Sequence, residues 1–175
     1  AYYWVDTFAY GGVPSTALSG GEDIDGHQIY VGRAFFKNDW IPAKVIPGRN
    51  VAYVAYAGKE HHVDRFQVLC EQRFDWVTAS EGRIPEGAVE GGRTCDGEAL
   101  YIGRVQHEGS HTLGKVRSSD GKAVVEEFVL GASELQVLLY SVRWEGAEFF
   151  GVRGADFEAV GRGVTGSEGE GVVVS

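Results

Sequence analysis

Apolar and polar residues alternate over short stretches of this chain, and turn-forming residues separate the stretches. A period of two is typical of β-strands with one buried face, and no stretch gives a convincing helical periodicity. Asp-Gly pairs at 25–26 and 96–97, each flanked by such alternation, indicate hairpins. We predict strands at residues 1–10, 28–36, 51–56, 66–70, 99–105, 124–130 and 135–140. Short strands at this spacing predict an all-β fold, an antiparallel β-sandwich or a barrel-like arrangement.

One segment of the sequence occurs twice. Residues 20–45 and 91–116 align without a gap, and 9 of 26 positions are identical. Trp4 and Trp76 stand at matching places ahead of the two segments. Self-similarity of this kind indicates a tandem repeat, here with an internal pseudo-twofold axis. We predict a first copy at 1–73, a second copy at 74–143, and a partial third copy at 144–175 that completes a sheet.

Composition and charge restrict the classes of partner. The chain has 175 residues, enough for one compact domain with a substantial core. A net charge of −9 argues against nucleic acid and against binding an anionic membrane by charge. No run of 18 apolar residues occurs, so no transmembrane segment is predicted. Cys70 and Cys95 are predicted to be buried thiols in preference to a disulfide, and no Cys/His spacing indicates a metal site or a cofactor.

Lysine and aspartate positions are the candidate ligand-binding residues. Lys44 and Lys115 are retained while most neighbouring letters change, although an exposed strand lysine is the alternative. Asp25 and Asp96 each precede glycine, where a role in the turn itself is the alternative. Asp23 has no acidic counterpart in the second copy. A carboxylate accepts hydrogen bonds and an ammonium group donates them, so together they suit adjacent hydroxyl groups of a sugar.

Tryptophans recur as well. Trp4, Trp76 and Trp144 occupy one repeat position, and we predict that they pack in the core, with a sugar-stacking platform as the alternative. A further strand is predicted to carry Lys44-Val45 in the first copy and Lys115-Val116 in the second, and Trp40 and its counterpart His111 are predicted on the loop before it. These two residues are the better candidates for lining a pocket.

Each copy also carries an arginine after a glycine. Arg33 and Arg104 stand in identical Gly-Arg contexts, and Glu60 and Glu134 recur later in each copy. Because arginine forks pair well with carboxylates, we predict an internal ion pair in each copy, Arg33 with Glu60 and Arg104 with Glu134.

These letters, taken together, resemble the DM9 repeat family over about residues 2–143, and weakly in the tail. The resemblance implies an all-β tandem-repeat domain. It also implies kinship with mannose-binding lectins that act in pattern recognition, with vesicle-associated proteins, and with the recognition domains of natterin-like pore-forming toxins. In the mannose-binding members an early Asp and the Lys of Gly-Lys-Val contact the sugar, which implies Asp23 or Asp25 and Lys44 here. The matching motifs are Gly20-Gly21, Asp25-Gly26, Gly32-Arg33, Lys44-Val45, Gly91-Gly92, Asp96-Gly97, Gly103-Arg104 and Lys115-Val116.

The functional hypothesis is a non-enzymatic lectin for mannose-type glycans, a pattern-recognition protein of innate immunity. No nucleophile motif, phosphate-binding loop or zinc-protease motif occurs in the sequence, and a duplicated unit suits multivalent binding. Open alternatives are a vesicle-associated scaffold and the recognition domain of a toxin. We expect a cytoplasmic or vesicular location, with secretion left open. The unfinished third copy leaves a homodimer open.

Overall fold

The fold is built almost entirely from β-strands, which confirms the all-β prediction. The computed structural model describes residues 1–79, 83–107, 109–119, 122–125, 134–144, 147–150, 159–160 and 173–174. One 3-10 turn, η1 (Pro47–Arg49), interrupts the described strands. The strands are β1 (Tyr3–Phe8), β2 (Ser19–Glu22), β3 (Gln28–Phe36), β4 (Asp39–Ile46), β5 (Val51–Tyr56), β6 (Lys59–His62), β7 (Arg65–Cys70), β8 (Phe74–Thr78), β9 (Glu90–Arg93), β10 (Ala99–His107), β11 (Ser110–Ser119), β12 (Lys122–Val125), β13 (Leu135–Trp144), β14 (Ala147–Phe150), β15 (Ala159–Val160) and β16 (Val173–Val174).

Local sequence accounts for the hairpins. Gly26 and Gly97 have φ of +81° and +90°, the conformation that an Asp-Gly turn requires, and they join β2 to β3 and β9 to β10. Lys37 and Asn38 also have positive φ and form the tight turn between β3 and β4. The predicted ranges 28–36 and 51–56 coincide with β3 and β5. The short strands β2 and β9 were not predicted, because their glycines gave no alternating pattern.

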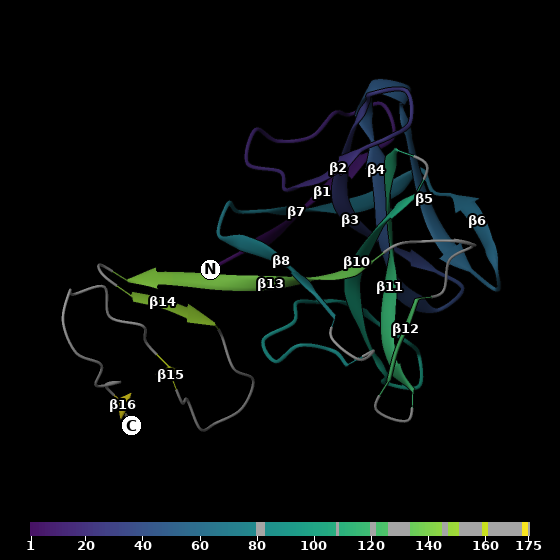
Figure 1. Cartoon of the computed structure of the whole chain (residues 1–175). Coiled ribbons are helices and arrows are strands. Elements are labelled where there is room, and N and C mark those ends of the chain that lie inside the picture. Colours follow the sequence, from purple (N-terminus) through teal and green to yellow (C-terminus); the bar gives the residue numbers. More distant parts are fainter. Residues whose placement is uncertain are drawn as a thin grey trace.

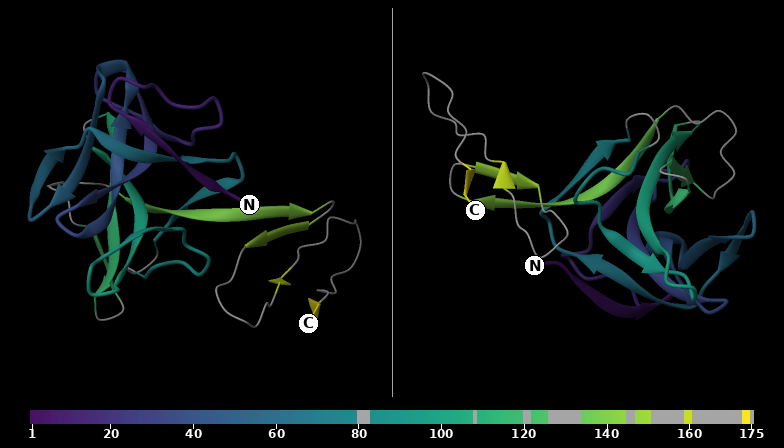
Figure 2. Two further views of the ribbon diagram at one scale, coloured as in Figure 1. Left: turned by 180° about the vertical axis from the view of Figure 1, so that it is seen from behind. Right: turned by 90° about the horizontal axis from the view of Figure 1, so that it is seen from below.

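Strands β1 to β14 join into an antiparallel network whose main path is β1-β7-β3-β4-β9-β10-β11-β12, and β15 and β16 pair separately. Strand β2 lies beside β3, β5 beside β4 and β6, and β13 beside β10, β8 and β14 (Figure 1). The N-terminal segment lies against β8 and β13, since the ring of Tyr2 contacts those of Phe74 and Tyr140. Figure 2 shows the same arrangement from behind and from below.

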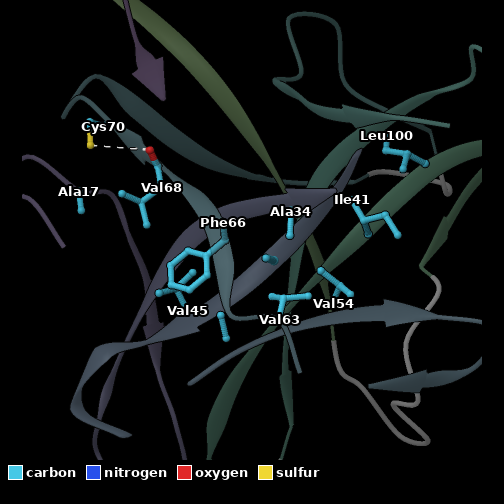
Figure 3. Packing of buried hydrophobic residues seen from close by; sticks show 12 residues of the cluster. Ala17, Ala34, Ile41, Val45, Val54, Val63, Phe66, Val68, Cys70 and Leu100 are labelled. Carbon is cyan, nitrogen blue, oxygen red and sulfur yellow. Dashed lines mark hydrogen bonds between the residues drawn. The ribbon is translucent and has the colours of Figure 1, made fainter. Parts of the chain in front are cut away.

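The two copies interlock. The contact that joins them in the network is the β4–β9 pair, where Trp40 stands opposite Arg93. One core cluster draws residues from both copies, namely Leu18, Ile29, Val31, Ile46, Leu69, Val89, Ile102, Leu113 and Leu138. A second cluster belongs mainly to the first copy, and Figure 3 shows Leu100 of β10 beside its Ile41. Each copy therefore buries apolar surface of the other.

Several predictions differ from the structure or concern residues outside its described part. Trp40 and His111 lie within β4 and β11, not on a loop, because the turns before them are shorter than predicted. Cys70 and Cys95 are free thiols as predicted, but Cys95 is exposed on the β9–β10 turn. Much of the 144–175 segment, including the side chain of Trp144, lies outside the described residues. The repeat boundaries and the pseudo-twofold axis stay predictions.

Candidate ligand-binding site

A cavity opens where the two copies meet. Its volume is about 360 Å³. Three parts of the chain form its walls: the N-terminal strand, the β3–β4 hairpin and strand β9. The lining residues are Tyr2, Trp4, Arg33, Trp40, Glu90, Gly92 and Arg93. The cavity therefore combines two indole rings, a phenol ring, two guanidinium groups and a carboxylate.

Arg33 lies between the two indole rings. Its guanidinium carbon is 4.2 Å from the ring centre of Trp4 and 5.1 Å from that of Trp40. Its Nε donates to the side-chain oxygen of Gln67 at 2.7 Å, and Gln67 in turn donates to Asp6 at 3.0 Å. Within the described part of the chain, the terminal nitrogens of Arg33 make no hydrogen bond. These N–H donors are available to a ligand in the cavity.

The partial burial of Arg33 affects the electrostatics of the cavity. Desolvation lowers the pKa of the Arg33 guanidinium, while Tyr2, Asp6 and Glu90 act in the opposite direction. An arginine remains charged at neutral pH even so. On the facing wall, Arg93 lies 2.7 Å from the carboxylate of Glu90 and donates to the carbonyl of Gly97 at 2.6 Å. Two cations and one carboxylate give the cavity a local excess of positive charge.

The second copy repeats part of this arrangement. The guanidinium of Arg104 lies 4.4 Å from the ring centre of Trp76, and its Nε donates to Gln136 at 2.8 Å. Its terminal nitrogen, however, donates to the carbonyl of Gly20 at 3.1 Å. His111 stands at the position equivalent to Trp40, and its Nδ1 accepts a long 3.5 Å hydrogen bond from the backbone of Glu22. Burial first, and then the charge of Arg104, lower the pKa of His111.

The predicted arginine–glutamate pairs are wrong. Arg33 and Arg104 bind the glutamines of a repeated Gln-Val-Leu motif on β7 and β13. Glu60 lies instead 2.7 Å from the ammonium of Lys44. The physical reason is strand register, since β3 pairs with β7 at Arg33 opposite Gln67, which places the amide at the guanidinium. The predicted core role of Trp4 and Trp76 is confirmed in part. Both rings pack against the shared core, and a guanidinium group also lies over each ring.

The predicted lysines are both largely buried on the sheet. Lys44 forms the pair with Glu60, and its ammonium lies 5.5 Å from the ring centre of Tyr53. Lys115 is 6% exposed, and its ammonium lies 5.5 Å from the ring centre of Tyr56. Neither lysine lines the cavity. A sugar bound to Lys44 would have to share it with Glu60.

The predicted aspartates lie on the hairpin turns. Asp23 binds Arg49 at 3.0 Å and caps the backbone of Ile24 at 2.9 Å. Asp25 lies 2.8 Å from the imidazole of His27, and both are partly exposed. Asp96 is exposed at the second turn. Of the residues predicted from sequence as ligand contacts, Trp40 is a wall of the cavity.

The contact between Asp25 and His27 has a measurable consequence. The imidazole of His27, 2.8 Å from the Asp25 carboxylate, and the backbone N–H of His27 hold the pKa of the Asp25 carboxyl below its ordinary value. Replacing His27 with alanine is expected to raise the pKa of Asp25 toward that of a free aspartate, as an NMR titration of the side-chain carboxyl would record. An unchanged Asp25 titration in the variant would contradict the contact.

Sequence reasoning missed Arg33, Glu90 and Arg93 as cavity residues. A usable signal was that each copy retains both an arginine, Arg33 or Arg104, and a later glutamine in a Gln-Val-Leu motif, Gln67 or Gln136. No local signal marks Glu90 or Arg93, whose counterparts in the first copy are Ser19 and Glu22. Their role arises from the packing of β9 against β4.

The described part of the chain carries neither a candidate membrane-spanning helix nor a cluster of metal-ligating side chains. No helix there is long and apolar enough to cross a membrane. No group of three or more His, Cys, Asp or Glu residues there could hold a metal ion.

Known proteins share sequence and structural features with this chain. The sequence profile of the DM9 repeat matches residues 23–128. The structure is similar to the crystal structure of the nematode sperm cell motility protein MFP2B, with a TM-score of 0.55 and 16% sequence identity. The match covers 79% of this chain and 46% of that one, so the chain spans about half the length of this structural relative. No curated protein matches.

Proposed function

We propose that this chain, which belongs to the DM9 repeat family, is a non-catalytic carbohydrate-binding protein whose site is the cavity between Trp4 and Trp40. The observation that carries the proposal is the guanidinium of Arg33, held between two indole rings with its terminal donors available. Indole rings pack against the C–H face of a pyranose, while arginine donors and a carboxylate bind its hydroxyl groups. The residues of the cavity supply all three kinds of contact.

Mannose-type glycans are the proposed ligand, and microbial surfaces the proposed target. The family resemblance supports this choice. A monosaccharide in a site of this size is expected to bind weakly, with a Kd of about 1 mM, or about −4 kcal/mol. A homodimer would present two such sites to a repetitive glycan and raise retention by avidity.

Calorimetry with mannose and mannan tests the proposal. Wild type is expected to bind both, and Trp40→Ala to weaken binding about tenfold, because an aromatic contact contributes about 0.5–1.5 kcal/mol beyond the area that it buries. Tyr10→Ala, which removes an aromatic ring that is 78% exposed and outside the cavity, is the matched control. Wild type that binds neither mannose nor mannan would overturn the proposal.

The same calorimetric titration tests whether the two lysines predicted from sequence, Lys44 and Lys115, contact the sugar. Lys44→Ala is expected to weaken mannose binding if the sugar reaches the β4 lysine, as the resemblance implies. Lys115→Ala examines the equivalent position of the second copy, whose lysine is 6% exposed. Wild-type affinity in both variants, together with a loss in Trp40→Ala, would assign the site to the cavity alone.

A further inference from the structure

The cavity continues into a row of stacked side chains that begins at Trp4 on β1 and extends along the β3–β4 hairpin. The row runs Trp4, Arg33, Trp40, Phe35, and its neighbours lie 4.2, 5.1 and 5.7 Å apart. Arg33 and Phe35 are two residues apart on β3 and so lie on one face, and Phe35 stands directly opposite Trp40 in the strand register. The row therefore leads outward from the cavity toward the turn at Lys37 and Asn38.

The outer end of this row is open to solvent. Phe35 is 59% exposed and Trp40 is 37% exposed, which is unusual for large apolar side chains on adjacent strands. Their rings meet at an interplanar angle of 55°, so they form a bent surface instead of a flat stack. Phe35 does not line the cavity itself. An apolar surface continuous with a binding cavity indicates contact with a further part of the ligand.

The second copy shows that the fold does not require these rings. There the equivalents of Phe35 and Trp40 are Gln106 and His111. The arginine–tryptophan contact is nevertheless kept, at 4.4 Å. The inner half of the row is therefore common to both copies, whereas the outer, exposed half is particular to the first. An exposed ring that the fold can do without points to a ligand contact.

We propose that Trp40 and Phe35 form a second subsite, so that the cavity takes a chain of at least two sugar residues and not a lone monosaccharide. This inference rests on the proposed carbohydrate function. One sugar unit of the glycan occupies the cavity beside Trp4 and Glu90. The next sugar unit lies across the rings of Trp40 and Phe35. Arg33 and Phe35 are two residues apart on β3 and so about 6.7 Å apart along the strand, which leaves room for a second sugar ring beyond the cavity.

The test is the dependence of affinity on chain length, measured by calorimetry with mannose, mannobiose and mannotriose. In wild type, mannobiose is expected to bind about fivefold more tightly than mannose, since one added aromatic contact contributes on the order of 1 kcal/mol. Phe35→Ala is expected to abolish that gain while leaving mannose affinity within about twofold of wild type. Phe35→Tyr, which keeps a ring, is expected to retain the gain.

The controls separate this inference from the proposed function. Tyr10→Ala is expected to keep both the mannose affinity and the gain from chain length, because its ring lies outside the row. Equal affinity for mannose and mannobiose in wild type would overturn the second subsite and leave the carbohydrate function standing. A gain that persists in Phe35→Ala would do the same. Failure of all three sugars to bind wild type would overturn both proposals.

Discussion

Replacing Gly92 with alanine is expected to destabilise the fold by more than about 3 kcal/mol. A methyl carbon at Gly92 would overlap the backbone carbonyl of Trp40, and backbone atoms in a paired strand cannot move aside as a side chain can. Gly92 lies on β9, the strand of the second copy that pairs with β4 of the first. The substitution would force the two copies apart at the cavity and lower the midpoint of urea unfolding.

Gly97→Ala is the control for that experiment. Gly97 has a positive φ, but an added methyl group there would meet open space. Its substitution is expected to destabilise by about 1 kcal/mol, from backbone strain alone. Equal unfolding midpoints for Gly92→Ala and Gly97→Ala would rule out the close approach of β9 to β4. The matching glycine in the first copy is Gly21, whose added methyl group would meet the ring of His111.

Arg33→Met is expected to reduce mannan binding about 30-fold or more. The change keeps an unbranched side chain between the two indole rings but removes the donors that the cavity offers to a ligand. Hydrogen bonds from a charged group contribute about 1.5–3 kcal/mol, which corresponds to roughly one to two orders of magnitude in affinity. Competition binding to immobilised mannan measures the loss.

Arg104→Met is the matched variant in the second copy. Arg104 also lies on a tryptophan and also binds a glutamine, but its terminal nitrogen is occupied by the carbonyl of Gly20. Its loss is expected to lower stability by about 1–3 kcal/mol through an unpaired carbonyl, with mannan affinity within about twofold of wild type. Equal loss of binding in Arg33→Met and Arg104→Met would mean that the arginines act through the fold and not through the ligand.

The duplicated glycines have a physical explanation in this arrangement. Gly20-Gly21 and Gly91-Gly92 are identical letters in the two copies, and each pair lies on a short strand packed against the other copy. Gly20 approaches the side chain of Leu113, and Gly91 approaches those of Ile102 and Pro42. The sequence repeats these letters because each copy must let a strand of the other approach closely.

Local sequence patterns predict part of the secondary structure of this protein. Alternating residues placed β3 and β5, and Asp25-Gly26 and Asp96-Gly97 placed two hairpins, because strand alternation and turn conformation depend on neighbouring residues. The duplication was also visible in the sequence alone. Trp40 could be proposed as a pocket residue because, unlike the recurring Trp4 and Trp76, it has a different residue, His111, at the matching position of the other copy.

The surroundings of these residues depend on the tertiary structure. Arg33 meets Gln67 instead of Glu60 because β3 and β7 pair in one particular register, which alternation alone does not specify. Trp4 and Glu90 share one cavity although 86 positions separate them, since β9 of the second copy crosses to β4 of the first. Contacts between distant segments depend on how whole strands pack, and that packing is encoded by the complete core and not by any local motif.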